Sequence, residues 1–389
     1  MKLQFIAQLF ALYCLLGSCS NTKLEKCTLE QTNRYSLPLQ KNTALANIEK
    51  IALNRIDDSL YISFLDNSTR AIYIYSFTDK KLIRSVDIQI KDFNILYSSY
   101  LIHNLDSIFL LDYRNSKLYL ISSSGVLQKK IEIRSTNLLS DNRNNQGYFA
   151  PFPTDGLNSN GFYFLNNKVY ISSSGNESVN YSSKCKDVFQ IDLDNNTSNL
   201  VFQKPLVFST GFWGNNFCHN IQIAFNPISN FFIVGYGIDH FVYATDFQTF
   251  NISHKLNSKS LTKIKPFSKE KPSLFRDLTD QEKNDIEQYD FLNGYYFGLY
   301  FDIYQNKYYR FANMPVRKKD YIRSMNTGVF EQKIAMVVAD SNFNIIKDFE
   351  LSGIHICPIF ILNGKFYFID RESYRNNSDS LYLSVYSIK

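Results

Sequence analysis

Cys19 is the residue whose chemistry is clearest, because it directly follows the run Leu16-Gly17-Ser18. Lys2 supplies a positive start, and an apolar stretch fills residues 3–16. These features are typical of a cleaved secretory signal, and the stretch is shorter than the roughly 20 residues that span a bilayer. The freed Cys19 can carry a diacylglycerol thioether on its sulfur and a further acyl chain on its amine. We therefore predict a lipoprotein signal peptide over residues 1–18 and lipidation at Cys19.

Two alternatives to lipidation remain open. In one, the chain is an ordinary secreted protein and Cys19 is incidental. In the other, the apolar stretch is kept as an anchor helix, although Gln4 and Gln8 interrupt it. Each buried methylene contributes about 0.8 kcal/mol to membrane binding, so several acyl chains would hold the protein at a membrane. A membrane is therefore the first expected partner.

Sequence motifs for catalysis or metal binding are absent from the chain. It has no glycine-rich phosphate loop, no HExxH, no GxSxG and no acidic calcium loop. The histidines are scattered, at His103, His219, His240, His254 and His355. The cysteines after Cys19 lack CxxC spacing and fit either one or two disulfides or buried thiols: Cys27, Cys185, Cys218 and Cys357. We therefore predict no cofactor, no metal site and no catalytic residue.

The single tryptophan, Trp213, marks the first candidate binding site. It lies between glycines in the run STGFWGNNFCHN, where an indole can stack on a sugar or a peptide aromatic while nearby amides hold polar groups. The structural alternative is that the ring wedges between neighbouring sheets. The predicted ligand-binding residues of this run are Trp213, Asn215, Asn216 and His219.

Arg310 is the second candidate, because it places a cation in the aromatic strand Tyr308-Tyr309-Arg310. Strand alternation puts Tyr308 and Arg310 on one face. Arg310 is therefore a candidate anion-binding residue, and the alternative is a structural stack on a neighbouring aromatic ring.

A repeated β-hairpin must position these residues. The chain holds 27 Tyr and 33 Phe but only 15 Gly and 9 Pro, a composition typical of aromatic strands joined by polar turns. A hydrophobic residue, a short polar turn and an aromatic-rich strand recur six times. The copies are centred on Ile56, Leu105, Leu165, Asn226, Gln305 and Leu362.

Each hairpin is followed by two further strands, except that the sixth copy ends after LYLSVYSIK. This deficit favours an all-β, six-bladed β-propeller of four-stranded antiparallel blades, whose last blade is closed by an N-terminal strand at residues 34–39. A pair of β-sandwiches is the alternative. The domain would fill residues 33–389, after a lipidated linker over residues 19–32.

Three segments interrupt the repeat. Residues 141–160 form a polar loop, and residues 174–186 extend a hairpin. An insert over residues 256–290 holds a short helix, for which Thr279 as N-cap and Glu282 three residues later predict a capping box.

The chain resembles a known family in its lipidation sequence, its six hairpins and the phrases YFDIYQNKYYRF and ADSNFNIIKDFEL. These are similar to an uncharacterised family of outer-membrane lipoproteins with a TolB-like six-bladed propeller. The resemblance implies a location and a fold but no activity. The segment SNTKLEK after Cys19 lacks the acidic run associated with surface export in related lipoproteins. We therefore expect an outer-membrane protein that faces the periplasm, with the cell surface as the alternative.

Two classes of function fit this chain. The net charge of +6 is spread along the sequence, so nucleic acid is not an expected partner. We favour a monomeric, non-catalytic binding or scaffold module that presents its loops to an envelope protein, peptide or glycan. The alternative is an envelope hydrolase or lyase that acts on a glycan or lactone through a metal bound at the propeller axis.

The Cys19 prediction is tested by replacing the acceptor thiol. Cys19→Ala should abolish labelling by a fatty-acid analogue and move the protein out of the membrane fraction, because no thioether can form. Cys27→Ala, at the next cysteine, should keep both properties. Unchanged labelling and partitioning of Cys19→Ala would show that the anchor lies elsewhere.

Overall fold

The structure is a computed structural model of the chain. It describes residues 24–43, 47–133, 149–151, 161–175, 186–213, 221–246, 249, 252–257, 264–268, 279–327, 332–352, 358–370 and 379–389. The predicted signal peptide and Cys19 lie outside these residues, as do Cys185, Cys218 and Cys357. Within the described part of the chain, no helix is long and apolar enough to cross a membrane.

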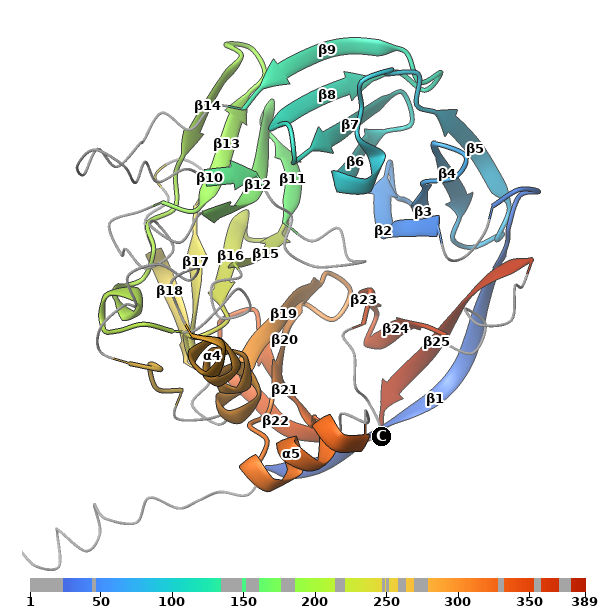
Figure 1. Ribbon diagram of the computed structural model, residues 1–389. Coiled ribbons are helices and arrows are strands. Elements are labelled where there is room, and N and C mark those ends of the chain that lie inside the picture. The colour runs from blue at the N-terminus through green and yellow to red at the C-terminus, as the bar shows by residue number, and fades with distance from the viewer. Residues whose placement is uncertain are drawn as a thin grey trace, which may run out of the picture.

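The described residues form a ring of mainly antiparallel sheets in a propeller-like arrangement (Figure 1). The first sheet holds β2 (Ile48–Ile56), β3 (Ser59–Asp66), β4 (Ala71–Ser76) and β5 (Leu82–Asp87). The second holds β6 (Ser98–Asn104), β7 (Ser107–Asp112), β8 (Lys117–Ile121) and β9 (Leu127–Glu132). Each sheet is a meander, so strands that follow one another in sequence pair with one another.

The third and fourth sheets continue the ring. The third holds β10 (Phe149–Pro151), β11 (Phe162–Leu165), β12 (Lys168–Gly175), β13 (Val188–Asp192) and β14 (Thr197–Leu200). Its β10 lies inside the segment 141–160 that the sequence analysis assigned to a loop. The fourth sheet holds β15 (Ile221–Asn226), β16 (Phe231–Tyr236), β17 (Phe241–Thr245) and β18 (Ile252–Asn257).

The remaining strands form one eight-stranded sheet. In spatial order they are β19 (Tyr295–Asp302), β20 (Lys307–Asn313), β21 (Ile334–Asp340), β22 (Ile345–Ser352), β1 (Glu25–Pro38), β25 (Ser380–Ile388), β24 (Lys365–Ile369) and β23 (Phe360–Leu362). The prediction of six four-stranded blades is therefore wrong, because the ring consists of four separate sheets and this eight-stranded sheet.

The physical reason for the difference is the length of β1. Glu25–Thr28 pair in parallel with β22, and Leu29–Pro38 pair antiparallel with β25. One strand thus joins what would otherwise be two sheets. Residues 25–32, which the sequence analysis assigned to a linker, belong to this strand.

All six predicted hairpins are present as antiparallel strand pairs. Their turns explain why the sequence shows them. Asn166 and Asn167 have φ values of 50° and 57°, and Asn363 and Gly364 have φ values of 50° and 70°. Two-residue hairpins that follow the strand twist require this left-handed backbone, which Asn, Asp and Gly adopt most readily.

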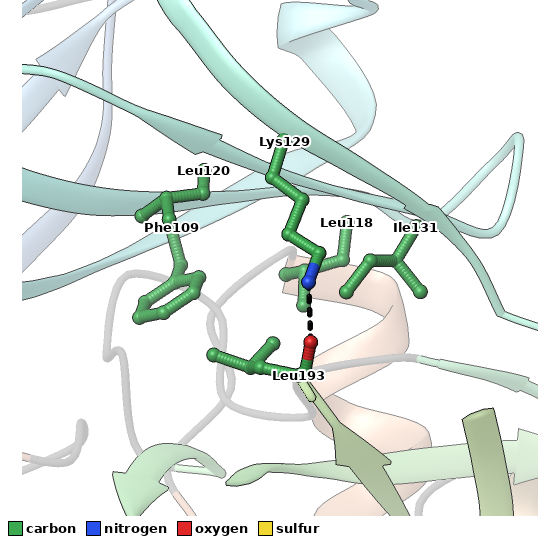
Figure 2. A pocket seen from close by; sticks show the side chains of 6 residues that line it. All are labelled: Phe109, Leu118, Leu120, Lys129, Ile131 and Leu193. Carbon is green, nitrogen blue, oxygen red and sulfur yellow. Dashed lines mark hydrogen bonds between the residues drawn. The ribbon is translucent and has the colours of Figure 1, made fainter. Parts of the chain in front are cut away.

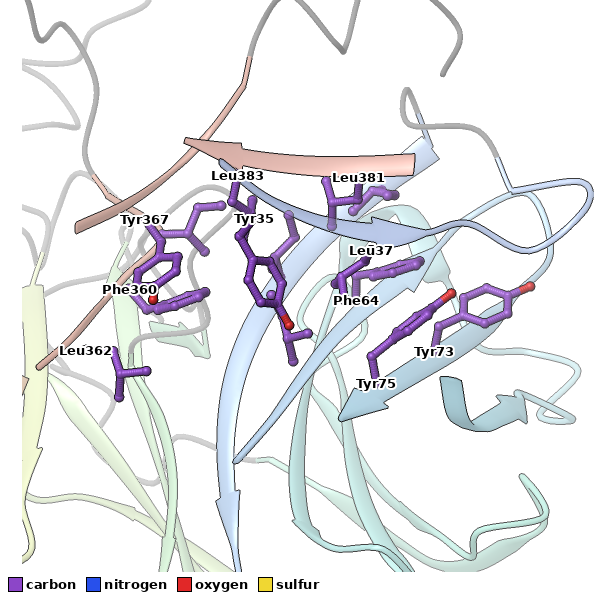
Figure 3. Close-up of a cluster of buried hydrophobic side chains, with 14 of the residues drawn as sticks. Tyr35, Leu37, Phe64, Tyr73, Tyr75, Phe360, Leu362, Tyr367, Leu381 and Leu383 are labelled. Carbon is purple, nitrogen blue, oxygen red and sulfur yellow. The ribbon is translucent and has the colours of Figure 1, made fainter. Parts of the chain in front are cut away.

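The core consists of apolar layers between neighbouring sheets. One layer packs Tyr35 and Leu37 of β1 and Leu383 of β25 against Phe64 and Tyr75 of the first sheet (Figure 3). Another lies between the two halves of the eight-stranded sheet, where Cys27 of β1 is buried as a free thiol. Because the layers lie between sheets, each sheet depends on its two neighbours for burial.

Two α-helices lie on the same side of the ring (Figure 1). α4 (Asp280–Asn293) begins with the predicted capping box: the Glu282 amide donates to Thr279 Oγ1 at 3.2 Å, and the Thr279 amide donates to Glu282 Oε2 at 2.8 Å. The Thr279 amide and hydroxyl both donate to the Glu282 carboxylate, and these two bonds lower the pKa of Glu282. α5 (Lys318–Thr327) was not predicted, and it lies between β20 and β21.

The closing strand provides a test of the ring. Leu37 is fully buried in β1, so Leu37→Ala should lower the free energy of unfolding by about 2–5 kcal/mol. Gln31→Ala, at an exposed position of the same strand, should change it by less than about 0.5 kcal/mol. Urea unfolding measures both, and equal stability of the two variants would mean that β1 adds little to closure.

Candidate functional site

The two edges of the ring carry connections of different length. In every meander, the turns between first and second strands and between third and fourth strands lie at one edge, here called the turn face. The described strand bounds leave two to six residues for these turns, from residues 57–58 to residues 246–251. The opposite edge, here called the loop face, carries the connections from sheet to sheet and from second to third strand.

Most long connections lie on the loop face. They include residues 201–220 with the 3-10 helix η3 (Leu206–Ser209), residues 258–294 with α4, and residues 314–333 with α5. Long surface loops on a rigid scaffold are where binding residues concentrate. The loop face is therefore the part of the fold in which to look for a site.

Arg310 of β20 lies beneath the loop face and is fully buried. Its guanidinium donates to the backbone oxygens of Tyr236 at 3.0 Å, Asp239 at 2.7 Å and His240 at 3.0 Å. These three acceptors belong to the end of β16 and its turn into β17. One side chain thus ties the fourth sheet to the eight-stranded sheet.

An aromatic ring completes the surroundings of Arg310. The guanidinium carbon lies 3.6 Å from the centre of the Tyr296 ring, and the Tyr296 hydroxyl lies 3.1 Å from His240 Nδ1. Burial lowers the pKa of Arg310, and the nearby Tyr296 and Asp239 oppose this effect. The observed arrangement is the structural stack named as the alternative for Arg310, and a surface ligand could reach this cation only after rearrangement.

Trp213 is also buried, with 3 % of its surface exposed. Its Nε1 donates to the Val207 oxygen at 3.1 Å, and its ring packs in a cluster with Phe208 and Tyr236 between the third and fourth sheets. This is the wedge position named as the alternative for Trp213. Asn215, Asn216 and His219 lie outside the described residues.

The Trp213 connection is tied to the predicted insert. The Phe212 amide donates to the Ser268 oxygen at 2.8 Å, and the Phe267 amide donates to the Phe212 oxygen at 2.7 Å. At Gly211 an added Cβ would lie 2.7 Å from Pro266 Cβ, so the close approach of the two segments requires glycine there. These contacts pack two loop-face connections together.

A buried ion pair that the sequence analysis missed lies in the same region. Asp187 Oδ1 and Lys204 Nζ are 3.5 Å apart, and both side chains are almost fully buried. Burial raises the pKa of Asp187 to about 6, and the nearby Lys204 opposes this shift. The pair joins the residues just before β13 to those just after β14, and it fixes the bases of two loop-face connections.

One exposed aromatic surface of the loop face lies at the second sheet. The 3-10 helix η2 (Ile95–Tyr97) exposes 62 % of Leu96 and 42 % of Tyr97. The Tyr97 ring meets Tyr113 edge-on at 5.9 Å, and the Arg114 guanidinium lies 5.1 Å from the Tyr97 ring centre. We call Leu96, Tyr97, Tyr113 and Arg114 the Tyr97 patch.

A buried carboxylate holds the Tyr97 patch in place. Asp112 is fully buried, and its side chain accepts hydrogen bonds from the backbone amides of Asn94 at 3.3 Å and Asn115 at 3.0 Å. The Tyr113 amide also donates to the Tyr97 oxygen at 3.0 Å. The patch therefore combines exposed aromatic surface with a fixed backbone, which suits recognition of a sugar or a peptide.

A hollow between the second and third sheets has a different character (Figure 2). Its lining is mostly apolar, and Lys129 Nζ closes it by donating to the Leu193 oxygen. The lining side chains leave no space for a water molecule. This hollow is a packed contact between sheets. Its residues are Phe109, Leu118, Leu120, Lys129, Ile131 and Leu193.

The described residues include no cluster of three or more His, Cys, Asp or Glu side chains that could hold a metal ion. Of the five histidines, His219, His254 and His355 have side chains outside the described set. His103 packs against Phe164, and burial lowers its pKa. The metal site of the hydrolase alternative would therefore need ligands from outside these residues.

The fold and this loop face define a propeller-like all-β protein. Residues 43–348 match the model of a family described as a domain of unknown function, DUF4221. The match covers more than half of the chain, so the chain belongs to the DUF4221 family. No curated protein matches it.

Solved structures show the same fold at low sequence identity. A DUF4221 family member from Bacteroides vulgatus has a TM-score of 0.68 and 14 % identity, with 94 % of this chain and 99 % of that chain covered. A candidate exported protein from Bacteroides fragilis has a TM-score of 0.51 and 11 % identity, with 94 % and 98 % covered. At these identities the similarity shows the fold alone.

The structural role of Arg310 is testable by substitution. Arg310→Lys should lower the free energy of unfolding by about 2–4 kcal/mol, because one ammonium nitrogen cannot replace the two guanidinium nitrogens that donate to the three carbonyl oxygens, and it has no planar group to stack on Tyr296. Lys307→Met, at the partly exposed start of β20, should change it by less than about 1 kcal/mol. Urea unfolding gives both values. If Arg310→Lys were as stable as the parent, the structural role of Arg310 would be contradicted and its ligand-binding role would be favoured.

Proposed function

We propose that the chain is a lipid-anchored outer-membrane lipoprotein of the cell envelope, with a TolB-like ring that acts as a non-catalytic binding or scaffold module. Cys19 carries the anchor, and the protein faces the periplasm. The loop face holds a protein, peptide or glycan of the envelope.

The unequal connections of the two faces carry this proposal. Short turns suffice to join the strands of a meander, as the turn face demonstrates. The longer connections of the loop face are not needed for the sheets, yet buried polar groups such as Asp187 and Asp112 hold their ends. Long loops whose ends are held by buried polar groups are expected where the loops contact a partner.

The location rests on the sequence before Leu24 and on one structural neighbour. Cys19 follows a short apolar stretch and small residues, the pattern of a lipoprotein signal. The neighbour from Bacteroides fragilis is named as a candidate exported protein. Both observations support a protein that leaves the cytoplasm.

The Tyr97 patch is the described surface that best fits the binding role. Tyr97 offers a ring with few rotatable bonds, and Arg114 adds an exposed cation beside it. A sugar ring or a peptide aromatic can stack on Tyr97 while the guanidinium binds an acceptor group. Leu96 extends the apolar area.

Binding of a defined probe set tests the function. Mature protein should bind members of a glycan array that includes peptidoglycan fragments, or of a peptide library, and Tyr97→Ala should weaken that binding about 10- to 100-fold. Tyr304→Ala is the matched control, because Tyr304 is 50 % exposed on the turn face. Equal loss of binding in both variants would argue against a loop-face site. Turnover of a bound glycan or peptide would argue against a non-catalytic role.

A further inference from the structure

α5 exposes apolar side chains beside a concentration of basic residues. Ile322 is 49 % exposed and Met325 is 57 % exposed. Together with Lys318 they occupy positions i, i+4 and i+7, so the three side chains form one stripe along the helix. A helix that only covered the ring would carry polar residues at such exposed positions.

A neighbouring face of α5 fixes the helix to the ring. Tyr321 and Ser324 are each 7 % exposed, and the Tyr321 ring lies 5.4 Å from the Phe291 ring of α4. The Val316 amide donates to the Phe291 oxygen at 2.8 Å. The exposed stripe therefore has a fixed orientation relative to the ring.

The charge of this segment is strongly positive. Residues 315–327 contain four basic residues and one acidic residue, Asp320, which gives a net charge of 4 − 1 = +3. Asp320 lies 2.6 Å from Arg317 and 3.8 Å from Arg323, yet both arginine side chains remain largely exposed. Exposed cations next to apolar side chains complement a bilayer surface with anionic headgroups. The basic residues are Arg317, Lys318, Lys319 and Arg323.

The start of the described chain lies on the same side of the ring. Leu24 and Met314 pack against one small cluster of residues from β19, β20 and β21, and Met314 lies four residues before α5. Figure 1 shows the beginning of β1 beside α5. The chain that leads to the predicted anchor thus leaves the ring next to this helix.

The length of the tether limits where the bilayer can be. Five residue steps separate Cys19 from Leu24, and an extended chain spans at most about 3.6 Å per residue, or roughly 18 Å. A domain of this size has a radius of gyration of about 20 Å. A lipid on Cys19 would therefore hold the bilayer near α5 and could not reach the far side of the ring.

We propose that α5 docks on the bilayer that holds the protein, with Ile322 and Met325 among the headgroups and the basic residues beside anionic phospholipid. This inference rests on the lipid anchor of the proposed function. It adds an orientation, in which the α5 side of the loop face is turned toward the membrane.

Photo-crosslinking in cells tests the docking. A benzoylphenylalanine at position 322 in the full chain should form adducts with phospholipid, detected as radiolabelled phosphate on the protein. The same residue at position 228, where Ile228 is 59 % exposed on the turn face, should form at least fivefold fewer adducts. Adducts only with protein at position 322, or equal lipid adducts at both positions, would overturn the proposal.

Charge reversal provides a second readout. Lys318→Glu with Lys319→Glu should reduce the lipid adducts at position 322 at least fivefold. These positions open α5, where acidic residues suit the helix dipole, so the helix should stay folded. Lys81→Glu with Lys130→Glu, at exposed positions of the first and second sheets, should leave the adducts unchanged. Equal adducts in both double variants would overturn the charge contribution and the docking with it.

The state of Cys19 separates the two proposals. If the chain is acylated and membrane-bound but position 322 forms no lipid adduct, the anchor stands and the docking is wrong. If position 322 forms lipid adducts in a chain without acylation, the helix docks and the anchor is wrong. Absence of both acylation and adducts would overturn both.

Discussion

The pairing of β1 with two strands from the C-terminal part of the chain is the constraint on which the ring depends. The first four residues of β1 pair with β22, and the next ten lie along β25. Without this strand, β22 and β25 would both expose an edge, and the layer around Leu37 would lose one side. Because β1 contacts apolar layers on both sides, one shared with the first sheet and one between the two halves of the eight-stranded sheet, an opening at this point would weaken burial in both layers. The strand that closes the ring also begins six residues after the predicted anchor, so closure and attachment involve the same end of the protein.

Much of the strand order could be predicted from the sequence, since it depends on local signals. The six hairpins combine alternating apolar residues with turns such as Asn166-Asn167 that favour left-handed backbone. The pairing of residues 34–38 with β25 followed from the missing strand of the last repeat. The parallel pairing of Glu25–Thr28 with β22 had no such signal, because the segment is largely polar and its partner lies more than 300 residues away. β10 was not predicted for a similar reason, since a three-residue strand within a polar segment is too short to show the alternation of apolar and polar residues.

The candidate site was less predictable, because residue type does not reveal burial. Trp213 and Arg310 were predicted to bind a ligand because they are unusual residues in polar or aromatic surroundings, but each contributes to the contact between two sheets. The Tyr97 patch combines residues from two connections that are unremarkable in sequence, and only the fold brings Tyr97 and Tyr113 together. For α5, a ten-residue pattern with three hydrophobic positions is too short to separate from a polar loop. Exposure decided the role in each of these cases, and exposure is a property of the tertiary structure.

The Tyr97 patch and α5 share the loop face but belong to different parts of the ring. The patch lies at the second sheet, and α5 lies on the eight-stranded sheet between β20 and β21. If α5 docks on the bilayer, the loop face is tilted toward the membrane, and a ligand at Tyr97 would lie near the headgroups. Such an arrangement selects partners that are themselves close to the membrane or small enough to enter beside it. A large partner from the open periplasm would be disfavoured by the bilayer, so the anchor would contribute to specificity as well as to location.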